Sequence, residues 1–314
     1  MGIKNLLQFL HDKTPSVFEH VSLSMYSGTT IAIDIMIYLY KYKHYYKGAW
    51  INGFVSLFAC LLDANITPLC VFDGRAPVEK IAVRTERRER KRRTEFKLSD
   101  ISATWETFKN NANMNEVPPS LMVIYNKRVR RLKRVSSPSL ADLASAVTTE
   151  LECLRNTLVS VSHEDMNTLR QYLQSIGVKY LTADGEAEEL CAQMCVRGDV
   201  RAVMSHDSDV LAYNTPIIIQ DINVETKTCT RICIENVLDA LELSYAQFLD
   251  FCIMCGTDYN QNMLRYGTNR SYNLIRKYKT IEAIAENVGL DIGVLNHIRV
   301  RELFSNRIIN DRYS

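Results

Sequence analysis

The chain has 314 residues, of which 46% are apolar and 24% charged, and its formal net charge is only +2. This length and composition allow one large domain or two smaller ones with a full hydrophobic core. No apolar run approaches the length of a membrane span, and the N-terminal residues lack the apolar stretch of a secretory signal. We therefore expect an intracellular protein, nuclear or cytoplasmic, whose nine cysteines are reduced.

Strands and helices alternate in the first part of the chain. The predicted elements are, in order, a helix and turn over residues 1–29, a strand over 30–34, helices over 35–46 and 50–64, and a strand over 68–73. The helix over 35–46 is rich in tyrosine and lysine, a combination that can stack on bases and hold phosphates. An amphipathic helix with tyrosines at the edge of the core is an equally good interpretation.

The middle of the chain is basic. A long helix over 80–97 carries a dense set of cations, namely Arg84, Arg87, Arg88, Arg90, Lys91, Arg92 and Arg93. Such a helix can grip phosphates, or it can simply be solvated. Residues 100–120 are polar and predict a mobile loop or cap. A second basic segment over 127–134, which also fits a nuclear-localisation patch, precedes a helix that we expect Ser137 to cap.

The second half of the chain again alternates strands and helices. A capping-box pattern at Ser162 begins a helix that Gly177 is expected to end. The elements predicted after it are a strand over 178–181, a helix from the Glu186 turn to about residue 197, strands over 200–204 and 216–220, and a helix over 244–255. A turn at Gly267 then opens a cationic helix, which could offer backbone N–H groups to a phosphate or be an ordinary helical hairpin.

Acidic residues follow the predicted strands at the ends where α/β sheets bind ligands. Asp34 and Asp73 end two strands, and Asp207 and Asp209 follow a third. Carboxylates crowded at one sheet edge repel one another unless a cation compensates, and oxygen-only sites suit Mg²⁺ or Mn²⁺. For any single pair, solvated loop acids would be the simpler interpretation. The recurrence over several strands favours a shared metal cluster.

The spacing within the Glu-rich turn leaves its metal ligands open. Glu186 and Glu188 cannot share one face of a regular helix, because residues two apart point in different directions. If both bind metal, one of them must precede or begin the helix. Spacing alone would equally allow Glu186 with Glu189.

Short motifs occur in a specific order along nearly the whole chain. They are Met1-Gly2-Ile3, Ala32-Ile33-Asp34, Val71-Phe72-Asp73-Gly74, Arg84-Thr-Glu-Arg-Arg88, Glu186-Ala-Glu188, Asp207-Ser-Asp209 and Gly256-Thr-Asp258-Tyr259, followed by the Gly267 turn. With this ordered set the chain resembles the flap endonuclease/XPG family of structure-specific 5′ nucleases.

The resemblance implies a fold and a domain organisation. The implied fold is α/β, with a mostly parallel central sheet, flanking helices, a helical arch or cap over the active site, and a helix–two-turn–helix element that binds DNA. The implied organisation is one nuclease domain over residues 1–314. Its regions are an N-terminal part over 1–97, the arch or cap over 80–160, an internal part over 161–260 and the helix–two-turn–helix over 258–290.

The resemblance also implies roles for individual residues. Two Mg²⁺ (or Mn²⁺) ions would be held by Asp34, Asp73, Glu186, Glu188, Asp207, Asp209 and Asp258. The implied catalytic residues are Asp34, Asp73 and Glu188, with Arg84 as the arch arginine and Lys80 as the nearest candidate for the arch lysine. The implied substrate-binding residues are Gly2, Tyr40 as the base-stacking aromatic, Arg84, Arg88, Lys91, Gly267, Asn269 and Arg270. A monovalent cation, K⁺, is implied at the two-turn element, where Arg265 replaces the family's first glycine.

These features predict a divalent-metal-dependent 5′ flap endonuclease that hydrolyses DNA at junctions between single strand and duplex, in replication, repair or recombination. Two metal ions would activate a water and stabilise the leaving oxygen. The alternatives are a 5′→3′ exonuclease or junction resolvase of the same family, an RNA nuclease, and a non-catalytic DNA-junction scaffold. We expect a monomer that binds DNA with a 5′ flap or another junction, has no membrane contact and carries no recognisable sliding-clamp box.

Overall fold

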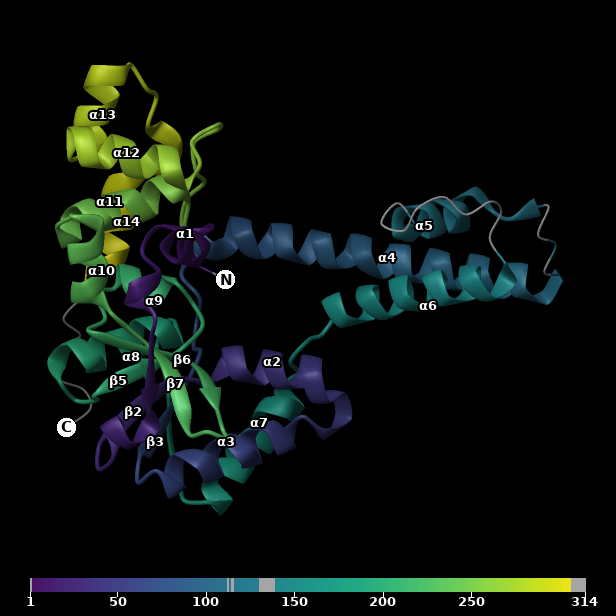
Figure 1. The fold of residues 1–314 in the computed structure, drawn as a ribbon, viewed down its shortest axis with the longest axis horizontal. Helices are drawn as coiled ribbons and strands as arrows, with labels where there is room; N and C mark the ends of the chain where they lie inside the picture. Colours follow the sequence, from purple (N-terminus) through teal and green to yellow (C-terminus); the bar gives the residue numbers. More distant parts are fainter. Residues whose placement is uncertain (1, 112, 114–115, 130–138, 306–314) are drawn as a thin grey trace. The chain divides into compact units, whose positions relative to one another are not determined.

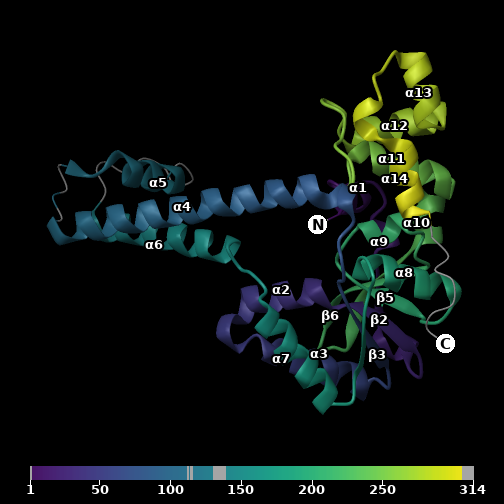
Figure 2. The same ribbon diagram turned by 180° about the vertical axis from the view of Figure 1, so that it is seen from behind.

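The computed structural model describes residues 2–111, 113, 116–129 and 139–305. The chain forms two compact units, shown from opposite sides in Figures 1 and 2. The first, here called the sheet unit, comprises Met1–Lys80 and Val161–Ser314, and the second, the helical unit, comprises Ile81–Ser160. Among the described helices, none combines the length and the apolar character needed to cross a bilayer.

A seven-stranded sheet organises the sheet unit. Its strands are β1 (Glu19–Ser22), β2 (Thr30–Asp34), β3 (Thr67–Phe72), β4 (Lys179–Thr182), β5 (Ala202–Met204), β6 (Ile217–Asn223) and β7 (Thr228–Cys233). They lie in the order β1-β7-β6-β5-β2-β3-β4. The strands from β6 to β4 pair in parallel, whereas β7 is antiparallel to β6 and β1 is antiparallel to β7. The predicted α/β fold with a mostly parallel sheet is therefore confirmed.

Three neighbouring parallel strands, β5, β2 and β3, bring their carboxyl ends to one edge of the sheet. β2 is paired with β5 on one side and β3 on the other, and Asp34 at its end lies opposite Val71. Both neighbours are short and apolar, and β2 is almost wholly buried, as expected for strands covered on both faces. The acidic residues that follow β2, β3 and β5 in the sequence consequently start from neighbouring positions.

Helices cover both faces of the sheet. One face packs on α2 (Ile35–Tyr46), α3 (Ile51–Asp63) and α7 (His163–Ser175), which lie together in Figure 1. The opposite core includes residues of α1 (Leu6–Lys13), α8 (Ala187–Arg197), α9 (Asp209–Ala212), α10 (Ile234–Leu241), α11 (Tyr245–Cys255), α12 (Thr268–Tyr278), α13 (Ile281–Val288) and α14 (His297–Phe304). Predicted helix boundaries hold at Ser162, whose capping box starts α7, and at Gly177, whose φ of 71° suits a residue just past a helix end.

Arg301 of α14 joins three of the C-terminal helices. Its guanidinium donates two hydrogen bonds of 2.6 Å to the carboxylate of Asp250 in α11. It also donates to both carboxylate oxygens of Glu282 in α13, at 2.6 and 3.0 Å. Asp250 is only 3% exposed, so this ion pair is largely removed from water. Bidentate Arg–carboxylate pairs are among the strongest polar contacts in proteins, and this one fixes the relative positions of the three helices.

The helical unit consists of α4 (Ile81–Asn111), α5 (Pro119–Val129) and α6 (Leu140–Thr157), which run side by side in Figure 2. The prediction of a loop over residues 100–120 is wrong up to Asn111, because α4 continues through that segment. The reason is packing: Ile101, Trp105 and Phe108 recur on one helix face and are buried against residues of α5 and α6. The helical unit thus has its own hydrophobic core, and the other tryptophan, Trp50, is buried in the sheet unit.

The start of α6 differs from the prediction. Ser139, not Ser137, caps α6, and it forms a capping box with Asp142. Ser137 and residues 130–134 of the second basic segment lie outside the described residues.

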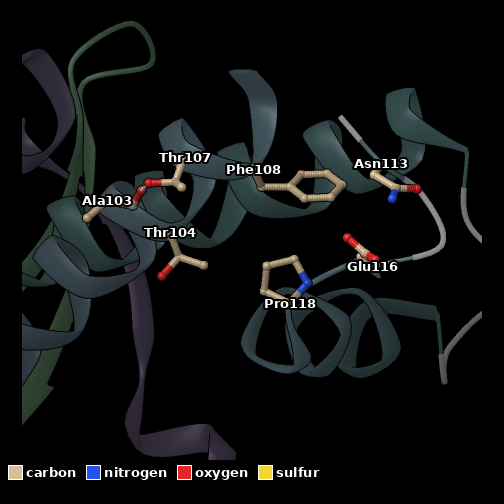
Figure 3. A pocket seen from close by; sticks show the side chains of 7 residues that line it. All are labelled: Ala103, Thr104, Thr107, Phe108, Asn113, Glu116 and Pro118. Carbon is tan, nitrogen blue, oxygen red and sulfur yellow. Dashed lines mark hydrogen bonds between the residues drawn. The ribbon is translucent and has the colours of Figure 1, made fainter. Parts of the chain in front are cut away.

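The helical unit contains a hollow of about 450 Å³, shown in Figure 3, where Thr104 and Phe108 of α4 face Glu116 and Pro118. Its remaining lining residues are Ala103, Thr107 and Asn113.

Candidate active site

The predicted acidic residues occupy one end of the sheet unit. Six of the seven are buried, and they are Asp34, Glu186, Glu188, Asp207, Asp209 and Asp258. Asp73 is the exposed member. Charged side chains are rarely buried unless something compensates them, so six buried carboxylates in one unit point to a cation-dependent site.

Local structure explains how two of these side chains reach the sheet edge. Asp34, the last residue of β2, accepts a hydrogen bond of 2.9 Å from Ser205, which follows β5. Asp73, directly after β3, accepts a hydrogen bond of 2.9 Å from the backbone N–H of Ala187. That N–H belongs to the first turn of α8, where a carboxylate is favoured by the helix dipole. Strand ends and a helix start are therefore tied together around the acids.

The structure gives the glutamates of the Glu-rich turn different positions on α8 (Ala187–Arg197). Glu186 is the N-cap residue of α8 and has extended backbone, whereas Glu188 lies in the first helical turn. One glutamate thus precedes the helix and the other begins it, which lets both approach the same region. Glu189 instead accepts a hydrogen bond from Gln193, one turn along the same helix.

The turn after β5 is packed against the N-terminal segment. The backbone N–H of Asp209 donates to Asp207 Oδ1 at 3.0 Å, which folds the two aspartates into one tight turn. Gly2 lies directly on this turn with φ of 78°. A Cβ atom at Gly2 would lie 2.1 Å from Asp207 Oδ1, so only glycine fits there. The structure therefore gives Gly2 a packing role beside the acids.

Asp258 comes from a turn that its neighbours hold in shape. The side-chain oxygen of Asn260 accepts hydrogen bonds from both the N–H and the hydroxyl of Thr257. The hydroxyl of the next residue, Tyr259, donates to Glu186 at 2.6 Å and lies 2.9 Å from the hydroxyl of Tyr213. Neither tyrosine was predicted as a site residue. Tyr259 directly follows the Gly-Thr-Asp motif, but no sequence signal points to Tyr213.

Lys80 provides a positive charge among the acids. It ends the short 3-10 turn η4 (Val78–Lys80) rather than beginning α4, and it is 6% exposed. Its ammonium lies 2.6 Å from Glu186, 3.3 Å from Glu188 and 3.5 Å from Asp258. It is also 5.1 Å from the centre of the Tyr259 ring. One lysine thus partly neutralises three carboxylates, the arrangement that a buried ammonium requires.

The site is strongly electronegative even with Lys80 in place. Burial, together with repulsion from Asp73 and Asp207, raises the pKa of Asp34 to about 8. Burial also raises the pKa of Glu188 and of Asp209 well above the ordinary range, and neighbouring carboxylates add to both shifts. For Lys80, burial opposes the charged form, but Glu188 and Glu186 outweigh it and raise its pKa. Upward pKa shifts of this kind are expected for a cluster of carboxylates with too little positive charge around it.

The donor chemistry of this cluster fits divalent metal ions. Neither carboxylate oxygen of the buried Asp209 accepts a hydrogen bond from the described residues, an orphaned pair of oxygens that a cation would satisfy. All candidate donors are carboxylate oxygens, which Mg²⁺ and Mn²⁺ prefer. As the described side chains stand, no three acidic, histidine or cysteine side chains are arranged to hold one ion. Three of the acids are instead turned toward Lys80.

The remaining predicted residues lie on three different elements. Tyr40 is 40% exposed on α2. Arg84, Arg88 and Lys91 are exposed on α4, in the helical unit. Gly267 is the N-cap residue of α12, and Asn269 and Arg270 are exposed in its first turn. The Arg270 guanidinium stacks on the Tyr266 ring at 3.9 Å and donates to its hydroxyl.

Arg265, at the position for which the resemblance implies a glycine, adopts a left-handed backbone with φ of 67°. For a residue with a side chain this conformation costs about 1–2 kcal/mol, which glycine avoids at the expense of a more flexible unfolded chain. We expect Arg265→Gly to raise the free energy of unfolding by about 0.5–1 kcal/mol, measured in urea. Leu264 is a neighbouring exposed residue whose backbone is not left-handed, so Leu264→Gly should not raise the free energy of unfolding. Equal effects of the two substitutions would contradict the explanation.

Comparison with known proteins matches most of the chain. Residues 1–94 match the XPG N-terminal domain, and residues 177–258 match the XPG I-region. The chain is 32% identical over 332 residues to a probable RAD2-like endonuclease of Invertebrate iridescent virus 3, covering 97% of this chain and 85% of that protein. It is 27% identical to flap endonuclease 1-2 of Paramecium tetraurelia, covering 92% of this chain and 68% of that protein.

The fold is also similar to solved structures. Flap endonuclease-1 from Methanococcus jannaschii superposes with a TM-score of 0.57 at 22% sequence identity. The match covers 95% of this chain and 84% of that one. At 22% sequence identity, this similarity shows a shared fold.

Proposed function

Because this chain belongs to the flap endonuclease/XPG family of nucleases, we propose that it is a divalent-metal-dependent 5′ flap endonuclease. Its substrate would be DNA at a junction between single strand and duplex, and its reaction the hydrolysis of a phosphodiester. Such an enzyme would act in replication, repair or recombination, at an intracellular site of DNA synthesis in the nucleus or cytoplasm. We further propose that it acts as a monomer.

The observation that best supports this proposal is the cluster of carboxylates at the carboxyl edge of β2, β3 and β5. A DNA-binding scaffold has no need of six buried acids, since buried charges destabilise a fold unless they are compensated. The orphaned oxygens of Asp209 and the raised pKa of Asp34 both indicate missing positive charge. A nuclease that uses bound metal ions explains why this costly arrangement is kept.

In this proposal the seven carboxylates hold the metal ions, and Asp34, Asp73 and Glu188 have the central catalytic roles. The ions, when bound, would activate a water and stabilise the leaving oxygen of the phosphodiester. Tyr213 and Tyr259 would keep Glu186 oriented through their hydrogen bonds. Lys80, once released from the acids, would donate to the phosphate oxygens together with Arg84.

Other parts of the chain would bind the DNA. The helical unit would supply the arch or cap, with Arg84, Arg88 and Lys91 contacting the strand that carries the 5′ end. Tyr40 would stack on a base near the cut. The first turn of α12, with Gly267, Asn269 and Arg270, would hold the duplex backbone, and K⁺ would bind at this turn. Residues 1–314 would thus act as a single nuclease domain.

A panel of labelled DNA substrates tests the proposed function. We expect rapid endonucleolytic release of a 5′ flap with Mg²⁺ or Mn²⁺, and none in excess chelator, because the acids alone cannot activate water. Matched nicked, gapped, blunt, four-way and RNA-containing substrates should react more slowly. Faster degradation of nicked or blunt ends would favour the exonuclease, and symmetrical cutting of the four-way junction would favour the resolvase. Binding without any cleavage would favour the scaffold.

A further inference from the structure

Lys41 of α2 has an unusual environment for a lysine beside an acidic site. Its ammonium lies 3.3 Å from the imidazole Nε2 of His206 and 5.9 Å from the centre of the Tyr38 ring. Among the described residues, no carboxylate lies within ion-pair distance of it. By contrast, Lys43 on the same helix pairs with Asp165, and Lys80 pairs with three acids. Among the described carboxylates, Lys41 therefore has no ion-pair partner.

His206 holds Lys41 next to the acidic cluster. It lies between Ser205, which donates to Asp34, and the predicted metal ligand Asp207. The Tyr38 ring packs against its imidazole at 5.6 Å between ring centres, and its Nδ1 lies 3.8 Å from Asp221. With its imidazole packed in this way, His206 can accept a hydrogen bond from Lys41 through Nε2. Of the three N–H donors of the ammonium, two are left for another acceptor.

The missing partner is most simply a phosphate. DNA that approaches the acids brings negative charge toward carboxylates that repel it, so a cation beside the cluster would lower the cost of binding. A lysine recognises phosphate as a point charge and needs no second side chain to do so. Tyr40, adjacent in the sequence and partly exposed, belongs to the same helix and is the proposed base-stacking residue. A base on Tyr40 and a phosphate on Lys41 would belong to one strand.

We propose that Lys41, positioned by His206, binds a backbone phosphate next to the phosphodiester that is cut. The proposal rests on the proposed function, since it assumes a DNA strand at the acidic cluster. Lys41 would contact the substrate, whereas His206 would act only through Lys41.

The test combines protein substitutions with neutralised phosphates. Lys41→Met keeps the length of the side chain but removes its charge, and Lys43→Met is the matched control on the same helix. Each protein is assayed with 5′ flap DNAs that carry a single methylphosphonate at successive positions around the cut. Equilibrium binding and the single-turnover cleavage rate are both measured. Circular dichroism and the thermal midpoint show whether each variant folds.

We expect one methylphosphonate position to weaken binding by wild type about tenfold, the size of one lost charged hydrogen bond. Lys41→Met should weaken binding of unmodified DNA equally, but should lose nothing more at that position, because the contact is already absent. It should also reduce the salt dependence of binding by about one counterion. Lys43→Met should behave like wild type throughout. His206→Ala should raise KM with little change in kcat, and it should add nothing to Lys41→Met.

The proposal is overturned if the losses from Lys41→Met and from the methylphosphonate multiply at every position, because independent effects exclude a direct contact. It is also overturned if Lys43→Met and Lys41→Met behave alike. Failure of the wild-type protein to cleave any flap would instead contradict the proposed function, and the binding measurements would still decide the role of Lys41.

Discussion

Asp73→Asn should reduce the rate of flap cleavage by about a thousandfold or more, equivalent to about 4 kcal/mol of transition-state stabilisation. Asparagine retains the shape of the side chain and an oxygen that can accept the hydrogen bond from Ala187, so the local fold should survive. What it removes is one negative charge from the proposed metal site. DNA affinity, measured in Ca²⁺ to prevent turnover, should change by no more than a few-fold.

Stability provides an independent readout for the same variant. Although the Asp73 side chain reaches the surface, loss of water around its carboxylate and repulsion from Glu186 raise its pKa, against the hydrogen bond from Ala187, so its ionised form is less favoured in the folded protein. Asp73→Asn should therefore leave the thermal midpoint in chelator unchanged or higher. Asp184→Asn, an exposed acid nearby in the sheet unit, is the control and should cleave like wild type. Substantial cleavage by a contaminant-free Asp73→Asn protein would remove Asp73 from the mechanism.

The second large effect concerns Arg301. We expect Arg301→Met to lower the free energy of unfolding by about 3 kcal/mol, because it leaves the buried carboxylate of Asp250 without its bidentate partner. Arg299→Met is a matched control on the same helix, since Arg299 pairs with Glu79 and Glu302 at a more exposed position. Arg299→Met should lower the free energy of unfolding by no more than about 1 kcal/mol. Urea unfolding of the two variants makes the comparison.

A pH series isolates the contribution of the second partner of Arg301, Glu282. The hydrogen bond from Arg301 is the largest influence on Glu282 and lowers its pKa from 4.5 to about 2. Since the folded pKa is depressed, the stabilisation is fully present above pH 4.5 and is lost as pH falls toward 2. This part of the pH dependence should disappear in Arg301→Met. If wild type and the variant lose stability in parallel over that range, the pairing of Arg301 with Glu282 is not the source of the pH dependence.

Local sequence signals predicted the elements that position the acids. β2 and β3 were found because each is a short apolar run that ends in an acid, and α7 because its capping box is a local pattern. β1 and β7 were missed because neither is a continuous apolar run, and β1 also depends on pairing with β7, which lies far away in the sequence. The end of α4 was missed because its apolar face is sparse and packs on α6, about 40 residues away.

The same distinction applies to the site itself. The resemblance and the spacing named the acids, but not the contacts between them. Tyr213 and Tyr259 are 46 residues apart in the sequence and meet only through the fold. Lys80 was predicted from its place near the basic helix, whereas its burial among Glu186, Glu188 and Asp258 depends on three other segments. Side-chain networks of this kind have no periodicity for a sequence pattern to reveal.

Because the helical unit has its own core, each unit contains one buried tryptophan, and the two units can be followed separately by fluorescence. The chain contains two tryptophans, Trp50 in the core of the sheet unit and Trp105 in the core of the helical unit. Replacing either one by phenylalanine leaves a single tryptophan, which reports on one unit alone when it is excited at a wavelength that tyrosine does not absorb. Emission spectra of such proteins can show whether DNA perturbs the interior of the helical unit while the sheet unit stays unchanged.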